Sequence, residues 1–426
     1  MNARLPTLTT RGQTFLALGV TTTVMGMVLG FPDITRVGVL LVLLPLLAVL
    51  ATWRRPPRIA VERVVVPGLV AAGQPARVHL ALTNDAGRRS LLYLAREEID
   101  PRLGADARFL LPRMDPGEVH RLTYDVSSAA RGPHHLGPLV LRQQDPFGLT
   151  RTGTVLPAET DVVVLPRIEE LGASRPRGHG AGNDGRIRHM VALHGEDDAS
   201  IRAYRDGDDL RRVHWPTTAH RGELMVRQED RPARRRAVLV LDPREDAHAG
   251  DGETGSFEWA VSALASVAVH LTDLGHAVHL VTADAVREGE AHHAQGLEAV
   301  LRALAVAEPA QGAFDEVLRL AHSLTGAGGI VVAVAVDDDG DALRRLAGIR
   351  PPGGAAYLLL LEAATFAPQA PRRRTGAPGG AGRGTAPALV GVVGTAGWRA
   401  EVVRAGTGVR AAWDRLTEAD VVAAVR

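Results

Sequence analysis

The side chains best placed for chemistry carry oxygen atoms and follow short apolar runs in the second half of the chain. Such runs at 237–241, 277–281 and 330–336 are each followed at once by an aspartate or a threonine. In an open parallel sheet, ligands bind beyond the carboxyl ends of the strands, and hard oxygen ligands suit Mg²⁺. The candidates for a divalent-cation site are therefore Asp242, Asp246, Thr282 and Asp337.

One neighbouring residue argues against an occupied metal site. Arg244 lies two residues after Asp242, where its guanidinium could pair with the carboxylate in place of an ion. The turn that begins at Asp242 also lacks the glycines of a dinucleotide-binding fingerprint. The simplest alternative is that these acids cap the next helix or turn. We therefore expect a degenerate site, with neither a metal nor a cofactor.

Composition removes several other chemistries. The chain has 426 residues and no cysteine, and all 49 of its Lys+Arg residues are arginine. A thiol nucleophile, a disulfide, a cysteine-ligated zinc, a Schiff-base lysine and a phosphate-loop lysine are thereby excluded. The net charge of +1 favours no nucleic-acid partner. The basic run that ends at Arg236 adjoins two acids and contains no aromatic residue, so we interpret it as a solvated connector or a lipid contact.

The candidate site requires a parallel sheet to position it. Apolar runs without alternation, at 237–241, 277–281, 330–336, 357–361 and 389–393, are typical of strands buried on both faces. Helices are predicted at 256–275 and 411–425, and the Gly/Pro/Arg-rich stretch 372–388 is predicted to be a disordered loop. Strands that alternate with helices predict a doubly wound α/β domain over 237–426.

Two further regions precede this domain. Residues 59–165 alternate apolar and polar side chains between turn signals, which predicts a β-sandwich-like domain. Residues 166–194 include a glycine-rich stretch without the end of a phosphate loop, and a flexible linker is predicted there. The histidine pairs at 134–135 and 292–293 lack ligand spacing, so we expect them at the surface or in loops.

The N-terminal region, 1–58, is predicted to be a transmembrane helical hairpin. Residues 14–31 and 37–53 are apolar enough to span a bilayer, and arginines flank the pair on one side only. This pattern places both ends in the cytoplasm and predicts a multi-pass protein of the plasma membrane. One alternative is a signal peptide that ends near Gly30, which the second apolar segment disfavours. A buried soluble hairpin is disfavoured because neither segment has a polar face.

The segment 195–236 contains the most distinctive motif of the chain, the sequence IRAYRDGDDLRRVHWPTTAHRGELMVRQED at 201–230. It resembles the signature of the domain of unknown function 58 family, and residues 131–149 are similar to that family's upstream element. The matching positions are Tyr204, Gly207, Asp208, Arg211 or Arg212, Trp215 and Ala219. The sequence departs from the pattern at Asp206, where proline is usual, and at His220, where arginine is usual.

The resemblance implies a bacterial membrane protein whose α/β domain is von Willebrand factor A-like. It also implies that Asp242 corresponds to the first ligand of that domain's Asp-x-Ser-x-Ser metal site, where this chain has Arg244 and Asp246 instead of serines. A MoxR-type AAA+ ATPase and a membrane transglutaminase-like protein are the partners it implies. The signature is interpreted first as a structural device, with a docking surface for an acidic partner as the near-equal alternative.

These observations favour a membrane-anchored cytoplasmic scaffold, an adaptor for a MoxR-type ATPase, and not an enzyme. One alternative is a hydrolase that uses a divalent metal at Asp242 and Asp337, although no activated nucleophile can be named. A metal-dependent adhesion protein is the other, and it would require the large domain to lie outside the cell.

Overall fold

The computed structural model divides the chain into two compact units, Met1–Arg167 and Ile168–Arg426. It describes residues 2–3, 7–53, 57–145, 147–172, 200–203, 215–228, 236–288, 294–326, 328–337, 340–351, 353–367 and 386–423. Most of the predicted linker, 173–194, and of the predicted loop, 372–385, lies outside these residues, as does the histidine pair at 292–293.

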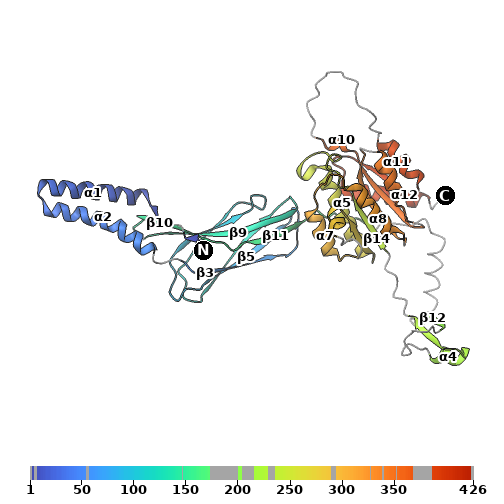
Figure 1. The fold of residues 1–426 in the computed structure, drawn as a ribbon, viewed down its shortest axis with the longest axis horizontal. Helices are drawn as coiled ribbons and strands as arrows, with labels where there is room; N and C mark the ends of the chain where they lie inside the picture. The colour runs from blue at the N-terminus through green and yellow to red at the C-terminus, as the bar shows by residue number, and fades with distance from the viewer. Residues whose placement is uncertain are drawn as a thin grey trace, which may run out of the picture. The chain divides into compact units, whose positions relative to one another are not determined.

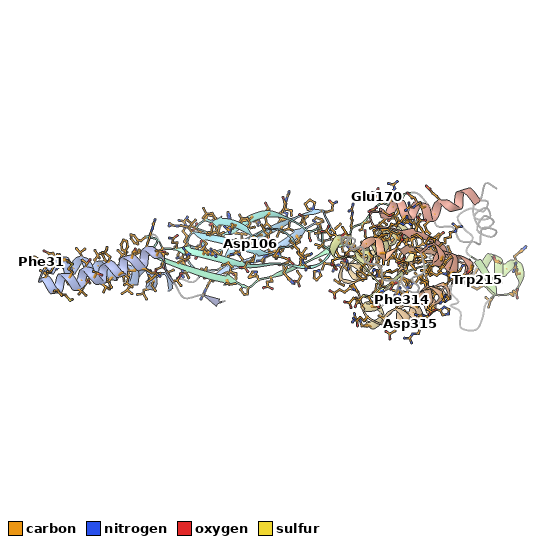
Figure 2. All side chains as sticks on the ribbon, turned by 90° about the horizontal axis from the view of Figure 1, so that it is seen from above. Phe31, Asp106, Glu170, Trp215, Phe314 and Asp315 are labelled. Carbon is orange, nitrogen blue, oxygen red and sulfur yellow. The ribbon has the colours of Figure 1, made fainter. Side chains whose placement is uncertain are left out.

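The first unit begins with two apolar helices, α1 (Thr10–Leu29) and α2 (Pro32–Trp53), which lie side by side (Figure 1). Thr9 caps α1 by accepting a hydrogen bond from the Gly12 N–H, and Gly30 ends it at a φ of 73°. Phe31 lies at the closed end of the hairpin (Figure 2). Both helices are long and apolar enough to cross a membrane, by length and composition.

Glycines set the separation of α1 and α2. A Cβ atom on Gly19 would lie 2.8 Å from the backbone nitrogen of Val42, and one on Gly26 would lie 2.6 Å from that of Thr35. A Cβ atom on Gly38 would collide with the backbone of Thr23. Small residues at such positions let the backbones of two apolar helices approach closely. The hairpin is therefore packed by backbone contact along its length.

The rest of the first unit is made of β-strands in two sheets. One sheet has the order β3-β5-β8, and the other contains β10-β9-β11-β4 with β6 and β7 extending it from β9. The strands are β3 (Ile59–Val66), β4 (Val70–Ala71), β5 (Pro75–Asn84), β6 (Tyr93–Ile99), β7 (Ala107–Leu111), β8 (Val119–Ser127), β9 (Gly132–Gln144), β10 (Thr150–Leu156) and β11 (Thr160–Leu165). Two short N-terminal strands, β1 (Asn2–Ala3) and β2 (Thr7–Leu8), pair with β10.

The two sheets enclose two apolar clusters between them. Leu80 and Leu82 of β5 cluster with Ala95 of β6 and with Leu139 and Leu141 of β9. Alternate residues of a strand point to opposite faces of its sheet, so each sheet presents one apolar face to the other. The alternation along 59–165 therefore predicted the strands and their buried face correctly.

The second unit contains a five-stranded parallel sheet in the order β15-β14-β16-β17-β18. Its strands are β14 (Arg236–Leu241), β15 (Ala277–Val281), β16 (Ile330–Val336), β17 (Ala355–Leu361) and β18 (Arg399–Val403). The chain leaves β14 for β15 on one side and later returns to β16 on the other. The topological switch point, where doubly wound folds bind ligands, is therefore between β14 and β16.

One predicted strand is wrong. Residues 389–393 belong to the helix α11 (Ala386–Thr395), and the fifth strand is β18. A short apolar run does not distinguish a buried strand from a buried helix. Ala386, Leu389 and Val393 are buried at helical spacing, and proline is favoured in the first helical turn, where Pro387 stands. Most of β18 is half-buried, so it lacks the continuous apolar pattern of its neighbours.

Helices cover both faces of the sheet (Figure 1). Buried residues of α8, α9 and α11 share a core with Val238 and Val240 of β14. On the face where Leu239 and Leu241 point, α5 packs against β14 and contacts α7 and α12. The helices are η2 (Gly252–Thr254), α5 (Ser256–Asp273), α6 (Ala283–Glu288), α7 (Leu297–Val306), α8 (Phe314–Thr325), α9 (Gly340–Ala347), α10 (Ala363–Phe366) and α12 (Val409–Ala423). The predicted helices at 256–275 and 411–425 are confirmed as α5 and α12.

Residues 168–172, within the predicted linker, are anchored to this unit. The Glu169 N–H donates to the Ser266 hydroxyl at 2.9 Å, and the Glu169 carboxylate accepts from the Arg410 N–H at 3.2 Å. Later in the sequence, before β14, the strands β12 (Ser200–Ala203) and β13 (Met225–Gln228) pair antiparallel. The short helix α4 (Trp215–Arg221) lies between them in sequence.

Candidate functional site

Asp242 lies at the topological switch point of the parallel sheet. Its side chain is fully buried, with an exposed fraction of 0%. It directly follows β14, and its carboxylate accepts a hydrogen bond from the N–H of Val336, the last residue of β16, at 3.2 Å. The carboxylate therefore bridges the carboxyl ends of the two strands where a ligand of a doubly wound sheet would bind.

Arg244 occupies the position next to this carboxylate. Its Nη2 donates to Asp242 Oδ2 at 2.7 Å, and its Nε donates to Oδ1 at 3.0 Å. The guanidinium carbon also lies 4.9 Å from the centre of the Phe314 ring, a cation–π contact. The expected pairing of Arg244 with Asp242 is thus confirmed, and it has the two-pronged geometry that makes such pairs strong.

His248 and Ser256 form a second contact behind Asp242. The Asp242 carbonyl oxygen can only accept, so His248 Nε2 donates to it at 3.0 Å. Nδ1 is then an acceptor, and the Ser256 hydroxyl donates to it at 2.9 Å. Ser256 is fully buried and also accepts from the Ala249 N–H at 2.9 Å. This serine–histidine pair therefore braces the turn after β14 and the start of α5.

The electrostatics around His248 favour its neutral form. Burial lowers the pKa of His248 below its ordinary value, and the positive charge of Arg244 lowers it further. The Asp242 carboxylate and the hydrogen bond to the Asp242 carbonyl act in the opposite direction but do not reverse the shift. A neutral imidazole is what the two hydrogen bonds require.

The other metal candidates have different partners. The Thr282 hydroxyl accepts from the Ala285 N–H at 3.1 Å, at the start of α6. Asp337 accepts from the Ala363 N–H at 3.0 Å, at the start of α10, and Asp246 is exposed. Thr282 and Asp337 thus hold the starts of helices, but the alternative of an acid that caps the turn directly after its strand fits Asp242, whose carboxylate accepts from the Arg244 N–H at 3.2 Å. Within the described ranges, no group of three or more histidine and acidic residues is positioned to hold a metal ion.

Only part of the signature motif can be placed. Tyr204, Gly207, Asp208, Arg211 and Arg212 lie outside the described residues. Trp215 begins α4 with 67% of its surface exposed (Figure 2), and Ala219 on the same helix is also exposed. The Thr218 hydroxyl accepts from the Met225 N–H at 3.0 Å and so ties α4 to β13. Trp215 is therefore not a core anchor in the described part of this segment.

Sequence reasoning missed several buried polar groups. Arg63 and Glu97 form an ion pair of 2.6 Å whose side chains are 1% and 0% exposed. His134 was expected at the surface, yet it is fully buried in β9 and lies 3.1 Å from Asp100. A backbone hydrogen bond from Arg102, followed by the contact with His134, lowers the pKa of Asp100. Glu97 has the strand phase of the buried Tyr93 and Ala95, and Arg63 has that of Ile59, so the period-two pattern is the local signal that could have marked them.

The signature and half of the α/β domain match a known family. Residues 200–341 match the family model described as "Protein of unknown function DUF58", which confirms the resemblance carried by the motif. The "Uncharacterized protein YeaD" of Bacillus subtilis is 25% identical over 146 residues, which are 34% of this chain and 35% of the relative. The chain thus spans about a third of the length of that curated relative.

Two solved structures match about a quarter of the chain each, at low TM-scores. The putative ApaA protein from Bordetella pertussis is 14% identical, with a TM-score of 0.20, over 26% of this chain and 94% of that one. The CARDB domain of the PF1109 protein from Pyrococcus furiosus is 18% identical, with a TM-score of 0.18, over 25% of this chain and 93% of that one.

Proposed function

We propose that this chain is a membrane-anchored interaction protein that presents its α/β domain to a cytoplasmic MoxR-type AAA+ ATPase. The observation that carries the proposal is the ion pair at the switch point. Arg244 occupies the place where a doubly wound domain would hold its ligand, and the carboxylate there is already paired. Interaction surfaces elsewhere on the second unit, Ile168–Arg426, are then the functional parts.

The α/β domain is, in this proposal, a von Willebrand factor A-like module with a degenerate metal site. Its parallel sheet, its acid after the first strand and its match to the DUF58 family support this assignment. The helical hairpin serves as the anchor, with both ends in the cytoplasm. Its large apolar side chains support this role, because many of them, such as Leu18, Met27 and Leu47, are exposed as in helices surrounded by lipid.

Trp215 is the residue on which we place partner contact. Tryptophan is enriched among the residues that dominate binding energy at interfaces. The experiment is photo-crosslinking in the native membrane, with a photoreactive amino acid in place of Trp215. The matched control carries it at Arg319, whose side chain is 77% exposed on α8.

The expected result is that position 215 captures a MoxR-type ATPase and that position 319 does not. In addition, Trp215→Ala should reduce co-purification of the ATPase while the midpoint of thermal unfolding stays within about 1 °C, because an exposed side chain contributes little to stability. Recovery of no AAA+ ATPase from either position would refute the partner. Equal capture from both positions would refute the role of Trp215.

A further inference from the structure

A pocket lined by arginines opens on the β domain (residues 59–165 with the preceding Pro57 and Arg58). Its lining includes Arg58, Asn84, Ala86, Arg88, Arg89 and Tyr93, and none of the described residues that line it is acidic. Arg58 and Arg88 are exposed. Arg89 pairs at 3.2 Å with Asp115, but both side chains are about two-thirds exposed, at 65% and 66%, and water and salt weaken such a pair. The pocket is therefore a concentration of positive charge.

The backbone around the pocket is held firmly. Asn84 is 1% exposed, and its amide donates to the carbonyl oxygens of Arg88 at 2.9 Å and Met114 at 3.0 Å. The Asp85 N–H donates to the Arg58 carbonyl at 3.0 Å, which joins the strand entry to the loop. The arginines are thus presented by a fixed turn, which lowers the entropy cost of binding a ligand.

The chain places this pocket next to the end of the apolar hairpin. Arg58 is five residues beyond Trp53, the last residue of α2. At about 3.6 Å per residue it lies at most about 18 Å from that helix end. The bilayer surface, if α2 spans it, is therefore close to the pocket.

A second feature lies at the same end of the unit. Phe147, in the turn between β9 and β10, is 67% exposed. The next two residues of this turn hold the start of α1, because Gly148 and Leu149 accept hydrogen bonds from the Thr9 hydroxyl and N–H at 2.6 Å and 2.9 Å. An exposed aromatic ring beside the entry of an apolar helix is suited to the interface of a bilayer.

We propose that this end of the β domain docks on the membrane and that the arginine pocket binds the headgroup of an anionic phospholipid. The inference rests on the proposed membrane anchoring and adds to it a defined lipid-binding surface. Guanidinium groups match phosphate oxygens in charge and geometry. An arginine near an anionic bilayer contributes about 1 kcal/mol of attraction, and Phe147 would add apolar contact.

The test uses the full chain in phosphatidylcholine vesicles with or without phosphatidylglycerol. Because the chain has no cysteine, Ala86→Cys gives a single labelling site for a fluorophore in the pocket. Quenching by a lipid with a spin-labelled headgroup reports docking. The variant is Arg58→Gln with Arg88→Gln. The matched control is Arg77→Gln with Arg102→Gln, which removes the same charge from exposed arginines of this unit. Arg77 lies away from the pocket, because it is opposite Val66 in the strand register, at the other end of β3 from Ile59.

We expect strong quenching only in the vesicles that contain phosphatidylglycerol, and a decrease on adding salt. Loss of two arginines should weaken the docking equilibrium roughly 30-fold, whereas the control variant should behave like the parent chain. Equal quenching in both kinds of vesicle, or equal effects of the two double variants, would overturn the inference. A response to inorganic phosphate in vesicles without phosphatidylglycerol would also overturn the assignment to lipid.

Alkaline extraction separates this inference from the proposal beneath it. Release of the chain from vesicles at high pH would refute membrane anchoring, whatever the arginine variants do. Retention in the membrane without headgroup quenching would refute only the lipid-binding surface.

Discussion

At Asp242, one neighbouring side chain decides what a strand-end carboxylate does. A buried carboxylate is stable only with compensating charge or hydrogen bonds. The Arg244 guanidinium supplies a two-pronged contact and a full positive charge, and the backbone N–H groups of Arg244 and Val336 also donate to this carboxylate. Binding a metal ion would require displacing a guanidinium that also contacts Phe314. Asp242 is therefore part of the framework of the domain.

Removing the guanidinium should leave an uncompensated buried charge. We expect Arg244→Ala to lower the free energy of unfolding by about 3–5 kcal/mol, measured by denaturant unfolding. The control is Arg345→Ala, whose side chain is 52% exposed in its pair with Asp315 and whose loss should cost less than about 1 kcal/mol. Combining Arg244→Met with Asp242→Asn should recover part of the loss. Equal costs for the two single variants would show that Asp242 is solvated.

His248 should make stability depend on pH. Its folded pKa is depressed, chiefly by burial, so below about pH 6.5 the unfolded chain takes up a proton that the folded chain resists. Its contribution to the free energy of unfolding is fully present above about pH 6.5 and is lost as the pH falls through the folded pKa. Chemical unfolding between about pH 5 and 8 should therefore show a shallower slope for His248→Gln. His322→Gln, which replaces an exposed histidine, should keep the parental slope. Identical slopes for both variants would contradict the assignment.

At the scale of elements, close backbone contact defines the hairpin. Gly19, Gly26 and Gly38 face backbone atoms of the opposite helix, and no space remains for a side chain at Gly38. Apolar helices in lipid gain little from the hydrophobic effect between them, so contact at small residues has to supply the association. Burial in the β domain follows a different rule, because its two sheets enclose apolar clusters between them.

Replacing Gly38 should separate the helices. Gly38→Leu forces a side chain against the Thr23 backbone, whereas Val39→Leu adds one methylene group at a position 48% exposed. Spin labels on cysteines at Thr10 and Ala51, near the open end of the hairpin, would report the distance between the helices. We expect a longer and broader distance distribution for Gly38→Leu. The distribution for Val39→Leu should match that of the parent chain. An unchanged distribution in both variants would show that the helices do not depend on this contact.

At the scale of the whole molecule, the proposed topology places the large domain inside the cell. An antiparallel hairpin that spans the bilayer brings both of its ends to one side, and its flanking arginines favour the cytoplasm. Protease added to intact spheroplasts should leave the α/β domain undigested, and lysis should expose it. Digestion without lysis would refute the topology and favour the adhesion alternative.

Metal binding separates the interaction protein from the enzyme and adhesion alternatives. We predict that Mg²⁺ or Mn²⁺ leaves the thermal unfolding of the detergent-solubilised chain unchanged. A site of micromolar affinity would add about 4 kcal/mol at millimolar metal, a shift that scanning calorimetry detects easily. An increase in melting temperature that disappears in Asp242→Asn would refute the degenerate site and support a metal-dependent activity.

The length and spacing of apolar residues in the sequence predicted the main elements of this protein. Apolar length predicted α1 and α2, alternation predicted the strands of the β domain, and unbroken apolar runs predicted β14 to β17. These features are local, because the spacing of apolar residues follows from helix and strand geometry. The pairing of Arg244 with Asp242 was also predicted, since the two residues are near neighbours in sequence.

Tertiary structure alone decided the rest. Residues 389–393 form a helix because the sheet takes β18 as its edge and needs a helix to cover its face. The pairing of Arg63 with Glu97 and the burial of His134 depend on strands distant in sequence. The exposure of Trp215 and the gathering of Arg58 with Arg88 and Arg89 are likewise properties of the folded surface. Residue type and spacing record local geometry, whereas burial and charge pairing are set by long-range contacts.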